Sequence, residues 1–182
     1  MSHKNIIKIR YEETADVFDR RYHEIQNSKY EIIFQNISIS SKQRILDAGC
    51  GTGFFFQFID DFECKKYGLD FSIESLKICR RRIGKESSIA ILCADADFLP
   101  FREEYFDIIL AITVLQNLPT PKKSLEEFKR VCKLNGLIIL SLLKKKFPPK
   151  RINNLLNDAQ LSPKQIIDDE KCEDVIVVIE NK

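Results

Sequence analysis

A glycine-rich segment directly after an apolar stretch is the strongest chemical feature of this sequence. Residues 49–53 are Gly-Cys-Gly-Thr-Gly, so half of the chain's six glycines lie in one short segment, and Asp47 stands just before them. Glycine lets a backbone turn tightly and lie against a ligand with no side chain between them. A helix that begins near Thr52 would point backbone N–H groups and its positive dipole end at this segment. The segment therefore predicts a site for a ligand with a carboxylate or a phosphate.

A second polar feature follows the next apolar stretch. Asp70 lies at about the 20-residue offset that separates a glycine loop from a ribose-binding acid in nucleotide folds. Its carboxylate can accept two charge-assisted hydrogen bonds from a ribose diol. A solvated aspartate is also ordinary at a strand end, so Asp70 gains its meaning from the loop that precedes it.

Alternating strands and helices are needed to bring these segments together, and the hydrophobic pattern predicts them. A helical entry is expected over residues 11–37. Strands are expected over residues 44–48, 66–70, 89–93, 106–113, 137–143 and 174–179, the last paired with residues 164–169. The stretch 106–113 is apolar on both faces, which is typical of a central parallel strand. Ligands of such sheets bind beyond the carboxyl ends of the strands.

Two of the expected helices have clear boundaries in the sequence. The helix after the glycine loop carries Phe54, Phe55, Phe58 and Phe62 on its apolar side. The helix that contains Leu125 and Phe128 is expected to end at residues 135–136, because Asn-Gly is a common helix stop.

The glycine spacing also distinguishes between families. The pattern G-x-G-x-G preceded by an aspartate differs from the G-x-G-x-x-G of dinucleotide folds, which argues against a nicotinamide-dependent oxidoreductase. Residues 47–53 instead resemble the first motif of class I S-adenosylmethionine-dependent methyltransferases. The resemblance covers residues 40–143 with motifs. It implies an α/β fold with a doubly wound, mostly parallel seven-stranded sheet, helices on both faces, an antiparallel C-terminal strand and the strand order 3-2-1-4-5-7-6.

The resemblance also implies the domain plan and the ligand. Residues 1–182 would form a single methyltransferase domain, with a helical entry or lid over 1–38 and a Rossmann-like core over 39–182. The cofactor would be S-adenosyl-L-methionine, and the product S-adenosyl-L-homocysteine.

Individual residues take their expected roles from the same resemblance. The loop would wrap the methionine part of the cofactor close to Asp47, and Asp70 would bind the ribose with Phe71 near the adenine. Asp95 would accept a hydrogen bond from the adenine amino group, although Asp97 competes for that role or lies in a solvent-facing turn. The expected cofactor-binding residues are Asp47, Gly49, Cys50, Gly51, Gly53, Asp70, Phe71, Asp95, Ala96 and Thr113.

No catalytic residue can be assigned from the sequence. Many family members that act on small molecules have V-L-H-H-L-P after the fourth strand, whereas residues 114–119 here are V-L-Q-N-L-P. Gln116 and Asn117 could orient an acceptor, but neither takes a proton at neutral pH. The chain lacks the Asp/Asn-Pro-Pro-Tyr motif of methylases that act on adenine or glutamine amide nitrogens. The missing histidines keep a non-catalytic, cofactor-binding scaffold open as the alternative.

Composition limits the remaining possibilities. The six cysteines are scattered with no C-x-x-C pair, so neither a zinc site nor a redox pair is expected, and no metal. The polar start and the absence of an apolar run of about 18 residues predict a cytoplasmic protein with no membrane segment. The net charge of +2 argues neither for nor against binding to nucleic acid. The basic runs 80–82 and 144–151 fit solvated surface better than a phosphate-steering patch.

The acceptor and the partners are the least determined features. The chain contains little beyond the cofactor fold, which favours RNA or protein over a small molecule as methyl acceptor. Tyr11 and Tyr22 of the entry helix either close over the cofactor or lie at the edge of the core. Residues 89–93 form an uncharged apolar strand at the implied sheet edge, and soluble proteins normally guard such edges. We expect a small zinc-binding activator protein, as some members of the resembled family require, or a second copy of the chain to pair there.

Overall fold

Strands and helices alternate along the chain in the computed structural model, which describes residues 23–84 and 88–182. The strands are β1 (Arg44–Ala48), β2 (Lys65–Asp70), β3 (Ala90–Cys93), β4 (Phe106–Ile112), β5 (Cys132–Leu143), β6 (Pro163–Ile167) and β7 (Asp174–Glu180). The helical elements are a helix over residues 23–36, α2 (Phe54–Phe58), α3 (Ile73–Ile83), the 3-10 turn η1 (Leu115–Asn117), α4 (Pro121–Val131) and α5 (Pro149–Asp158).

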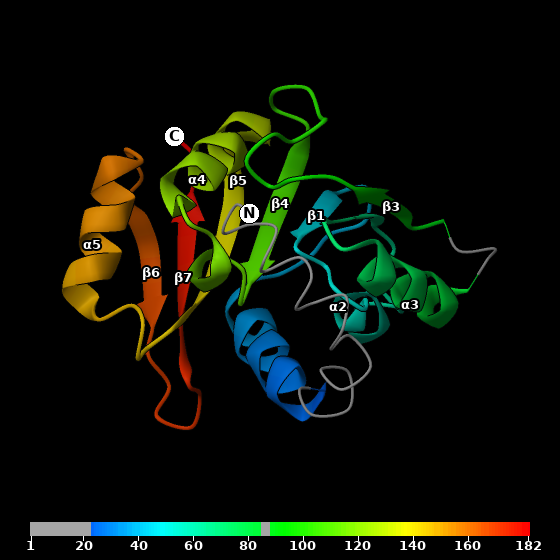
Figure 1. Cartoon of the computed structure of the whole chain (residues 1–182), viewed down its shortest axis with the longest axis horizontal. Coiled ribbons are helices and arrows are strands. Elements are labelled where there is room, and N and C mark those ends of the chain that lie inside the picture. Colours follow the sequence, from blue (N-terminus) through cyan, green and yellow to red (C-terminus); the bar gives the residue numbers. More distant parts are fainter. Residues whose placement is uncertain (1–22, 85–87) are drawn as a thin grey trace.

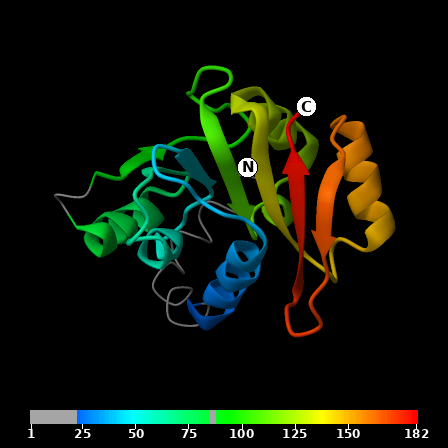
Figure 2. The ribbon, with the colours of Figure 1, turned by 180° about the vertical axis from the view of Figure 1, so that it is seen from behind.

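The strands form one sheet in the order β3-β2-β1-β4-β5-β7-β6 (Figures 1 and 2). β1 to β5 are parallel, and β7 is antiparallel to both β5 and β6. This arrangement confirms the expected class I methyltransferase fold and its strand order. The reversal of strand order between β1 and β4 creates a crevice at the carboxyl ends of these strands.

Two hydrophobic layers hold helices against the two faces of the sheet. On one face α4 and α5 contribute buried side chains, with Phe128 and Leu156 each at most 1% exposed. On the other face the helix over residues 23–36 packs with α2 and α3 through Ile33, Phe55 and Cys79. The central strand β4 is apolar on both sides because both layers cover it, as its sequence predicts. No helix in the two described ranges is long and apolar enough to span a membrane.

Two element boundaries differ from those expected. The helix after the glycine loop ends at Phe58, and Phe62 lies outside it and is 36% exposed. The helix that contains Phe128 ends at Val131, and β5 begins at once at Cys132. The Asn135-Gly136 pair therefore lies at an irregularity in the pairing of β5 with β4 and does not end a helix. Asn135 has a φ of 61°. Local sequence cannot separate these cases, because both need a residue that tolerates positive φ.

The strand β3 lies at the edge of the sheet, as expected, and it is short. Ala90 and Cys93 at its two ends are exposed, while Ile91 and Leu92 are half-buried. Ile89, which the pattern placed in the strand, is buried just before it. The backbone groups on the outer side of β3 have no strand beside them within the described residues.

Candidate functional site

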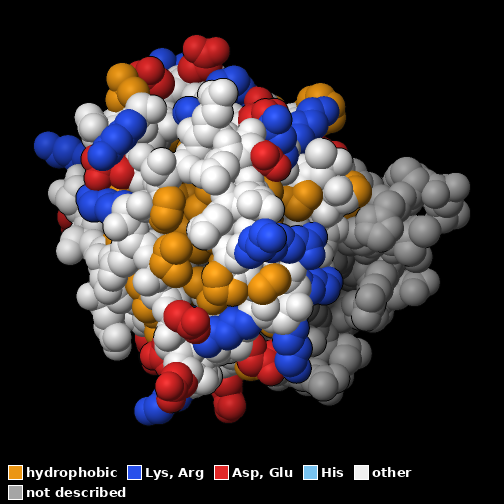
Figure 3. Space-filling view, turned by 90° about the vertical axis from the view of Figure 1, so that its left-hand side faces the viewer, with side chains coloured by type: hydrophobic (Ala, Val, Ile, Leu, Met, Phe, Trp, Pro, Cys, Tyr) orange, Lys and Arg blue, Asp and Glu red, His pale blue; other side chains and the backbone are white. Residues whose placement is uncertain are grey.

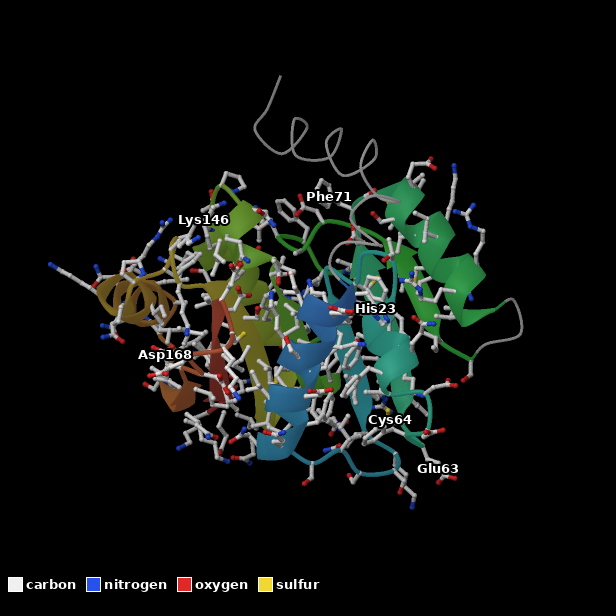
Figure 4. All side chains as sticks on the ribbon, turned by 90° about the horizontal axis from the view of Figure 1, so that it is seen from below. His23, Glu63, Cys64, Phe71, Lys146 and Asp168 are labelled. Carbon is white, nitrogen blue, oxygen red and sulfur yellow. The ribbon has the colours of Figure 1, made fainter. Side chains whose placement is uncertain are left out.

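A pocket lies where the crevice was expected, beyond the carboxyl ends of β1, β2 and β4. Figure 4 looks at this end of the sheet and shows Lys146 to the left of both Phe71 and His23. The pocket contains every expected cofactor-binding residue except Gly53. Its lining comprises Gln26, Tyr30, Asp47, Gly49, Cys50, Gly51, Thr52, Phe54, Leu69, Asp70, Phe71, Ser75, Ala94, Asp95, Ala96, Ile112, Thr113, Val114, Asn117 and Leu118.

The three loop glycines have different structural roles. All have positive φ, at 92° for Gly49, 50° for Gly51 and 86° for Gly53. A Cβ atom added to Gly49 would lie 2.4 Å from a methyl carbon of Val114, and one added to Gly53 would lie 2.6 Å from the Cys79 sulfur. A Cβ atom on Gly51 would meet no protein atom within 4 Å. Gly49 and Gly53 are therefore required by packing, whereas Gly51 keeps space open in the pocket.

We expect Gly51→Val to retain the fold and lose ligand binding. The added side chain would enter open space on the ligand side, and the positive φ would cost about 1–2 kcal/mol. Calorimetry with S-adenosylhomocysteine should show no measurable binding, while thermal unfolding stays cooperative. Gly84→Val is the matched control, because Gly84 also has positive φ, open surroundings and no place in the pocket. Normal binding by a folded Gly51→Val would show that this loop is not the ligand site.

Asp70 joins the ends of β1 and β2 through backbone hydrogen bonds. Its Oδ2 accepts from the Gly51 N–H at 2.9 Å, and its Oδ1 accepts from the Ser72 N–H at 2.8 Å. Burial raises the pKa of Asp70, and these N–H donors oppose that rise. The carboxylate therefore fixes the loop geometry, and its remaining lone pairs are the ones that a ligand can use.

Asp47 is a buried carboxyl group at the end of β1 and is 3% exposed. No hydrogen bond to its side chain is present among the described residues. Burial, and secondarily the negative charge of Asp70, raises the pKa of Asp47 to about 8. A buried acid without donors favours a ligand that brings positive charge or N–H groups to it.

The turn after β3 separates the two candidate acids of that segment. Asp95 lines the pocket, and its Oδ1 also accepts a hydrogen bond from the Asp97 N–H at 3.0 Å. Asp97 is 4% exposed, is not among the residues that line the pocket, and accepts a hydrogen bond from the Ser124 hydroxyl in α4. Asp97 therefore anchors the turn, and Asp95 with Ala96 is left to contact a ligand.

Thr113 at the end of β4 has the unusual φ of 63°, which is a strained value for a β-branched residue. Its hydroxyl accepts a hydrogen bond from Lys29 Nζ at 2.8 Å. The same Lys29 Nζ lies 2.8 Å from Asp174 Oδ2, and both side chains of this ion pair are buried. The hydroxyl of Thr113 is thus engaged by Lys29, and Thr113 also lines the pocket.

Sequence reasoning missed the residues that the helix over 23–36 contributes to the site. Gln26 lines the pocket and is 6% exposed, and its amide Nε2 lies 3.5 Å from the Thr113 hydroxyl. Lys29 lies behind it, paired with Asp174 of β7. Polar positions in an amphipathic helix are normally predicted to face solvent, so only a polar position on the apolar side could have indicated them.

The segment after β4 supplies amide groups and no histidine. Asn117 lines the pocket, and its Nδ2 donates to the Thr113 carbonyl at 3.0 Å. Both polar side-chain atoms of Gln116 are buried without hydrogen-bond partners, and Gln116 lies outside the lining. The ring of His23 packs edge-on against Phe54 at 4.9 Å. Tyr11 and Tyr22 lie outside the described residues.

The basic stretches contribute contacts at two places. Arg82 in the last turn of α3 donates to the Thr52 carbonyl at 2.6 Å and lies over the Phe54 ring, so it braces the glycine loop. Lys146 donates to the Gln116 carbonyl at 3.2 Å, which places one lysine of the stretch 144–151 beside the pocket segment. Lys144 pairs with Asp168 at 2.6 Å, and Figure 3 shows basic and acidic side chains mixed over this end of the molecule.

The side chains of the described residues do not form a metal site. No group of three histidine, cysteine or acidic side chains is arranged to hold a metal ion within residues 23–84 and 88–182.

Comparison with known proteins gives the family. Residues 46–140 match the family model described as a methyltransferase domain. An uncharacterized protein of Methanocaldococcus jannaschii, MJ1123, is 35% identical over 136 residues, which is 73% of this chain and 60% of that protein. The tRNA (carboxymethyluridine(34)-5-O)-methyltransferase of Arabidopsis thaliana is 39% identical over 108 residues, which is 58% of this chain and 25% of that protein. Other relatives are named malonyl-[acyl-carrier protein] O-methyltransferase and demethylmenaquinone methyltransferase.

Solved structures share the fold at low sequence identity. A S-adenosylmethionine-dependent methyltransferase from Aquifex aeolicus has a TM-score of 0.77 at 20% identity, covering 94% of this chain and 98% of that one. One chain of the complex between the Haloferax volcanii Trm112 methyltransferase activator and its methyltransferase has a TM-score of 0.74 at 16% identity, covering 94% and 97%. The chain therefore belongs to the family described as a methyltransferase domain, and it shares the fold of S-adenosylmethionine-dependent methyltransferases.

Proposed function

We propose that this chain is an active methyltransferase that uses a macromolecular acceptor, and that the acceptor is RNA. The observation that supports this proposal best is that one pocket is lined by the expected cofactor-binding residues other than Gly53. These residues come from the ends of β1, β2, β3 and β4. The pocket fits the cofactor because Gly51 leaves space in it and because Asp47 offers an acceptor that no described donor satisfies. Asp70 and Asp95 are proposed to bind the ribose and the adenine.

The reaction we propose depends on alignment more than on proton transfer. The cofactor supplies a methyl group on a sulfonium, which an acceptor removes by in-line displacement. Gln116 and Asn117 cannot take a proton at neutral pH, and the carboxyl groups of the pocket are assigned to the cofactor. The acceptor atom must therefore be a good nucleophile by itself, and Asn117 would orient it by hydrogen bonding.

Two observations support RNA as the acceptor. Lys146 lies against the Gln116 carbonyl, so a positive charge stands beside the segment that an acceptor must pass. One relative with 39% identity is named as a tRNA methyltransferase. Phosphate groups are attracted to lysines at such a rim, and this attraction weakens with salt.

The proposal is tested by incubating the purified chain with methyl-labelled cofactor and cell extract. Label should enter material that ribonuclease digests and protease does not, and Asp70→Ala should abolish the transfer. Label that protease releases would move the acceptor to protein, and label confined to small molecules would contradict a macromolecular acceptor. Tight cofactor binding with no transfer to any fraction would favour the non-catalytic scaffold.

A partner at the β3 edge is a second part of the proposal. The outer side of β3 has no neighbouring strand in the described residues, and Ala90 and Cys93 at its ends are exposed. A solved structure of this fold forms a complex with the Trm112 activator. We propose that a small activator protein, or failing that a second copy of the chain, adds a strand there.

Hydrogen exchange on the natively purified protein tests this interface. The amides of β3 that point away from β2 should exchange slowly in the native assembly and become fast after the partner is removed. A fully active monomer with rapid exchange at these amides would contradict a partner at this edge.

We also propose a single methyltransferase domain and a cytoplasmic location. Most of the entry or lid expected over residues 1–38 lies outside the described residues, which begin at residue 23. All six cysteines are free thiols in the structure. Free thiols are typical of a reducing compartment. Subcellular fractionation of the native organism's cells tests the location.

A further inference from the structure

The turn after β3 carries the most exposed large hydrophobic side chain of the described residues. Phe98 is 65% exposed, although burial of an aromatic ring is normally favourable. The same turn belongs to the pocket, because Asp95 and Ala96 line it. The Phe98 N–H donates to the Asp95 carbonyl at 3.0 Å, so one hydrogen-bonded turn contains both the pocket lining and the exposed ring. An aromatic side chain is thus available to a ligand directly beside the pocket.

Helix α4 fixes the position of this turn on both sides of the exposed ring. Asp97 accepts a hydrogen bond from the Ser124 hydroxyl, and the Leu99 N–H donates to Glu127 Oε2 at 2.7 Å. Arg130 donates to the Leu99 carbonyl at 3.0 Å and pairs with Glu127 at 2.7 Å. Asp97 and Leu99 are each 4% exposed. The ring is therefore presented to solvent by a braced backbone, which lowers the entropy cost of binding to it.

A lysine at the start of α4 lies against one face of the ring. Lys123 Nζ is 3.4 Å from the centroid of the Phe98 ring, which is a cation–π contact. Lys122, its neighbour in the chain, is exposed and lies 3.7 Å from Glu126. The ammonium of Lys123 covers one face of the ring, and most of Phe98 remains exposed. The pair suits a ligand that combines a flat aromatic group with negative charge.

An unpaired nucleobase with its phosphate has this combination of properties. Bases stack on exposed aromatic side chains in proteins that bind single strands, and nearby lysines attract the phosphates. A protein partner normally covers a contiguous apolar patch. No other large hydrophobic side chain of residues 94–131 is exposed, so Phe98 is an isolated aromatic group. The surroundings of the ring therefore favour a nucleic acid over a protein.

We propose that Phe98 stacks on an unpaired base of the RNA acceptor, with Lys123 beside an adjoining phosphate. This inference rests on the proposed RNA acceptor and names a contact for it outside the cofactor site. Phe98 does not touch the reacting atoms. It holds a neighbouring nucleotide, so that the strand lies across the pocket beside Asp95 and Ala96.

A tryptophan at position 98 reports stacking directly. The chain has no tryptophan, so Phe98→Trp introduces a single indole at the proposed contact. An oligoriboadenylate of about 12 nucleotides should quench its fluorescence, because a stacked base contacts the indole. Phe62→Trp is the matched control, because Phe62 is an exposed phenylalanine after α2 and outside the pocket lining. The oligomer should leave the fluorescence of this control unchanged.

Binding measurements separate stacking from charge. Phe98→Leu should weaken the oligoriboadenylate about fivefold or more, because leucine is apolar but offers no stacking face. It should leave an abasic ribose-phosphate oligomer of the same length unaffected. Lys123→Gln should weaken both oligomers, since both carry phosphates. Phe62→Leu should bind both as the wild type does.

The other outcomes overturn the inference in distinguishable ways. Wild-type affinity of Phe98→Leu for the oligoriboadenylate, or a Phe98→Trp that binds it without quenching, would overturn the stacking contact and leave the RNA acceptor in place. Equal weakening of both oligomers by Phe98→Leu would also overturn it, because the loss would then not involve a base. A wild-type chain that binds neither oligomer would overturn the contact and the RNA acceptor together.

Discussion

Asp70→Ala should lower the affinity for S-adenosylmethionine about a hundredfold or more while the fold survives. The substitution removes two proposed hydrogen bonds to the ribose, and hydrogen bonds to charged groups contribute about 1.5–3 kcal/mol each. Their combined loss of about 3 kcal/mol or more corresponds to about two powers of ten in affinity. The substitution also frees the Gly51 and Ser72 N–H groups that hold the loop, which adds to the loss.

Calorimetric titration of Asp70→Ala with S-adenosylmethionine measures this effect, and thermal unfolding checks that the variant is folded. Asp61→Ala is the control, because Asp61 is an exposed aspartate in the turn after α2. Affinity equal to that of the wild type in a folded Asp70→Ala would remove Asp70 from the site.

Asp47→Asn should make the protein less sensitive to pH than the wild type between about pH 4 and pH 8. The pKa of Asp47 is raised to about 8 by burial, then by Asp70, whereas an aspartate in an unfolded chain has a pKa of about 3.9. In this window the folded state holds a proton that the unfolded state has released. Rising pH therefore favours unfolding, and the wild type loses up to about 5 kcal/mol of its free energy of unfolding. Asparagine cannot titrate, so the variant escapes this loss.

Urea unfolding at pH 5 and at pH 8 measures the effect as the difference between wild type and Asp47→Asn. Groups remote from Asp47 titrate equally in both proteins, so the difference reports Asp47 together with its coupling to neighbours such as Asp70. Asp61→Asn should follow the wild type at both values. Parallel pH dependence of wild type and Asp47→Asn would mean that Asp47 is ionised throughout the window.

The order of the elements and most of the pocket could be predicted from the sequence. The alternation of apolar strands with amphipathic helices predicts a parallel sheet, and the special residues stand where strands end. The glycines and Asp70 are visible because each is a residue type that the local backbone or the ligand requires. Such requirements act within a few residues, so a short segment of the sequence is enough to identify them.

Element boundaries were harder to predict for a local reason. Asn135-Gly136 suits both a helix stop and a strand irregularity, because positive φ is accepted in both. The choice between a helix stop and a strand irregularity depends on a backbone hydrogen bond, because Asn135 donates its N–H to the Asn181 carbonyl at 2.7 Å. That partner lies at the far end of the chain, and no short segment contains both.

The sequence by itself determined the class of fold, the cofactor loop and the acids at the strand ends. Only the tertiary structure decided which of these residues line the pocket: Gly51 and Asp95 line it, whereas Gly53 and Asp97 do not. It alone brought Gln26 into the pocket and paired Lys29 with Asp174. The physical reason is that a polar residue's burial depends on partners distant in sequence, and a chain pattern records only which residues are near each other along the backbone.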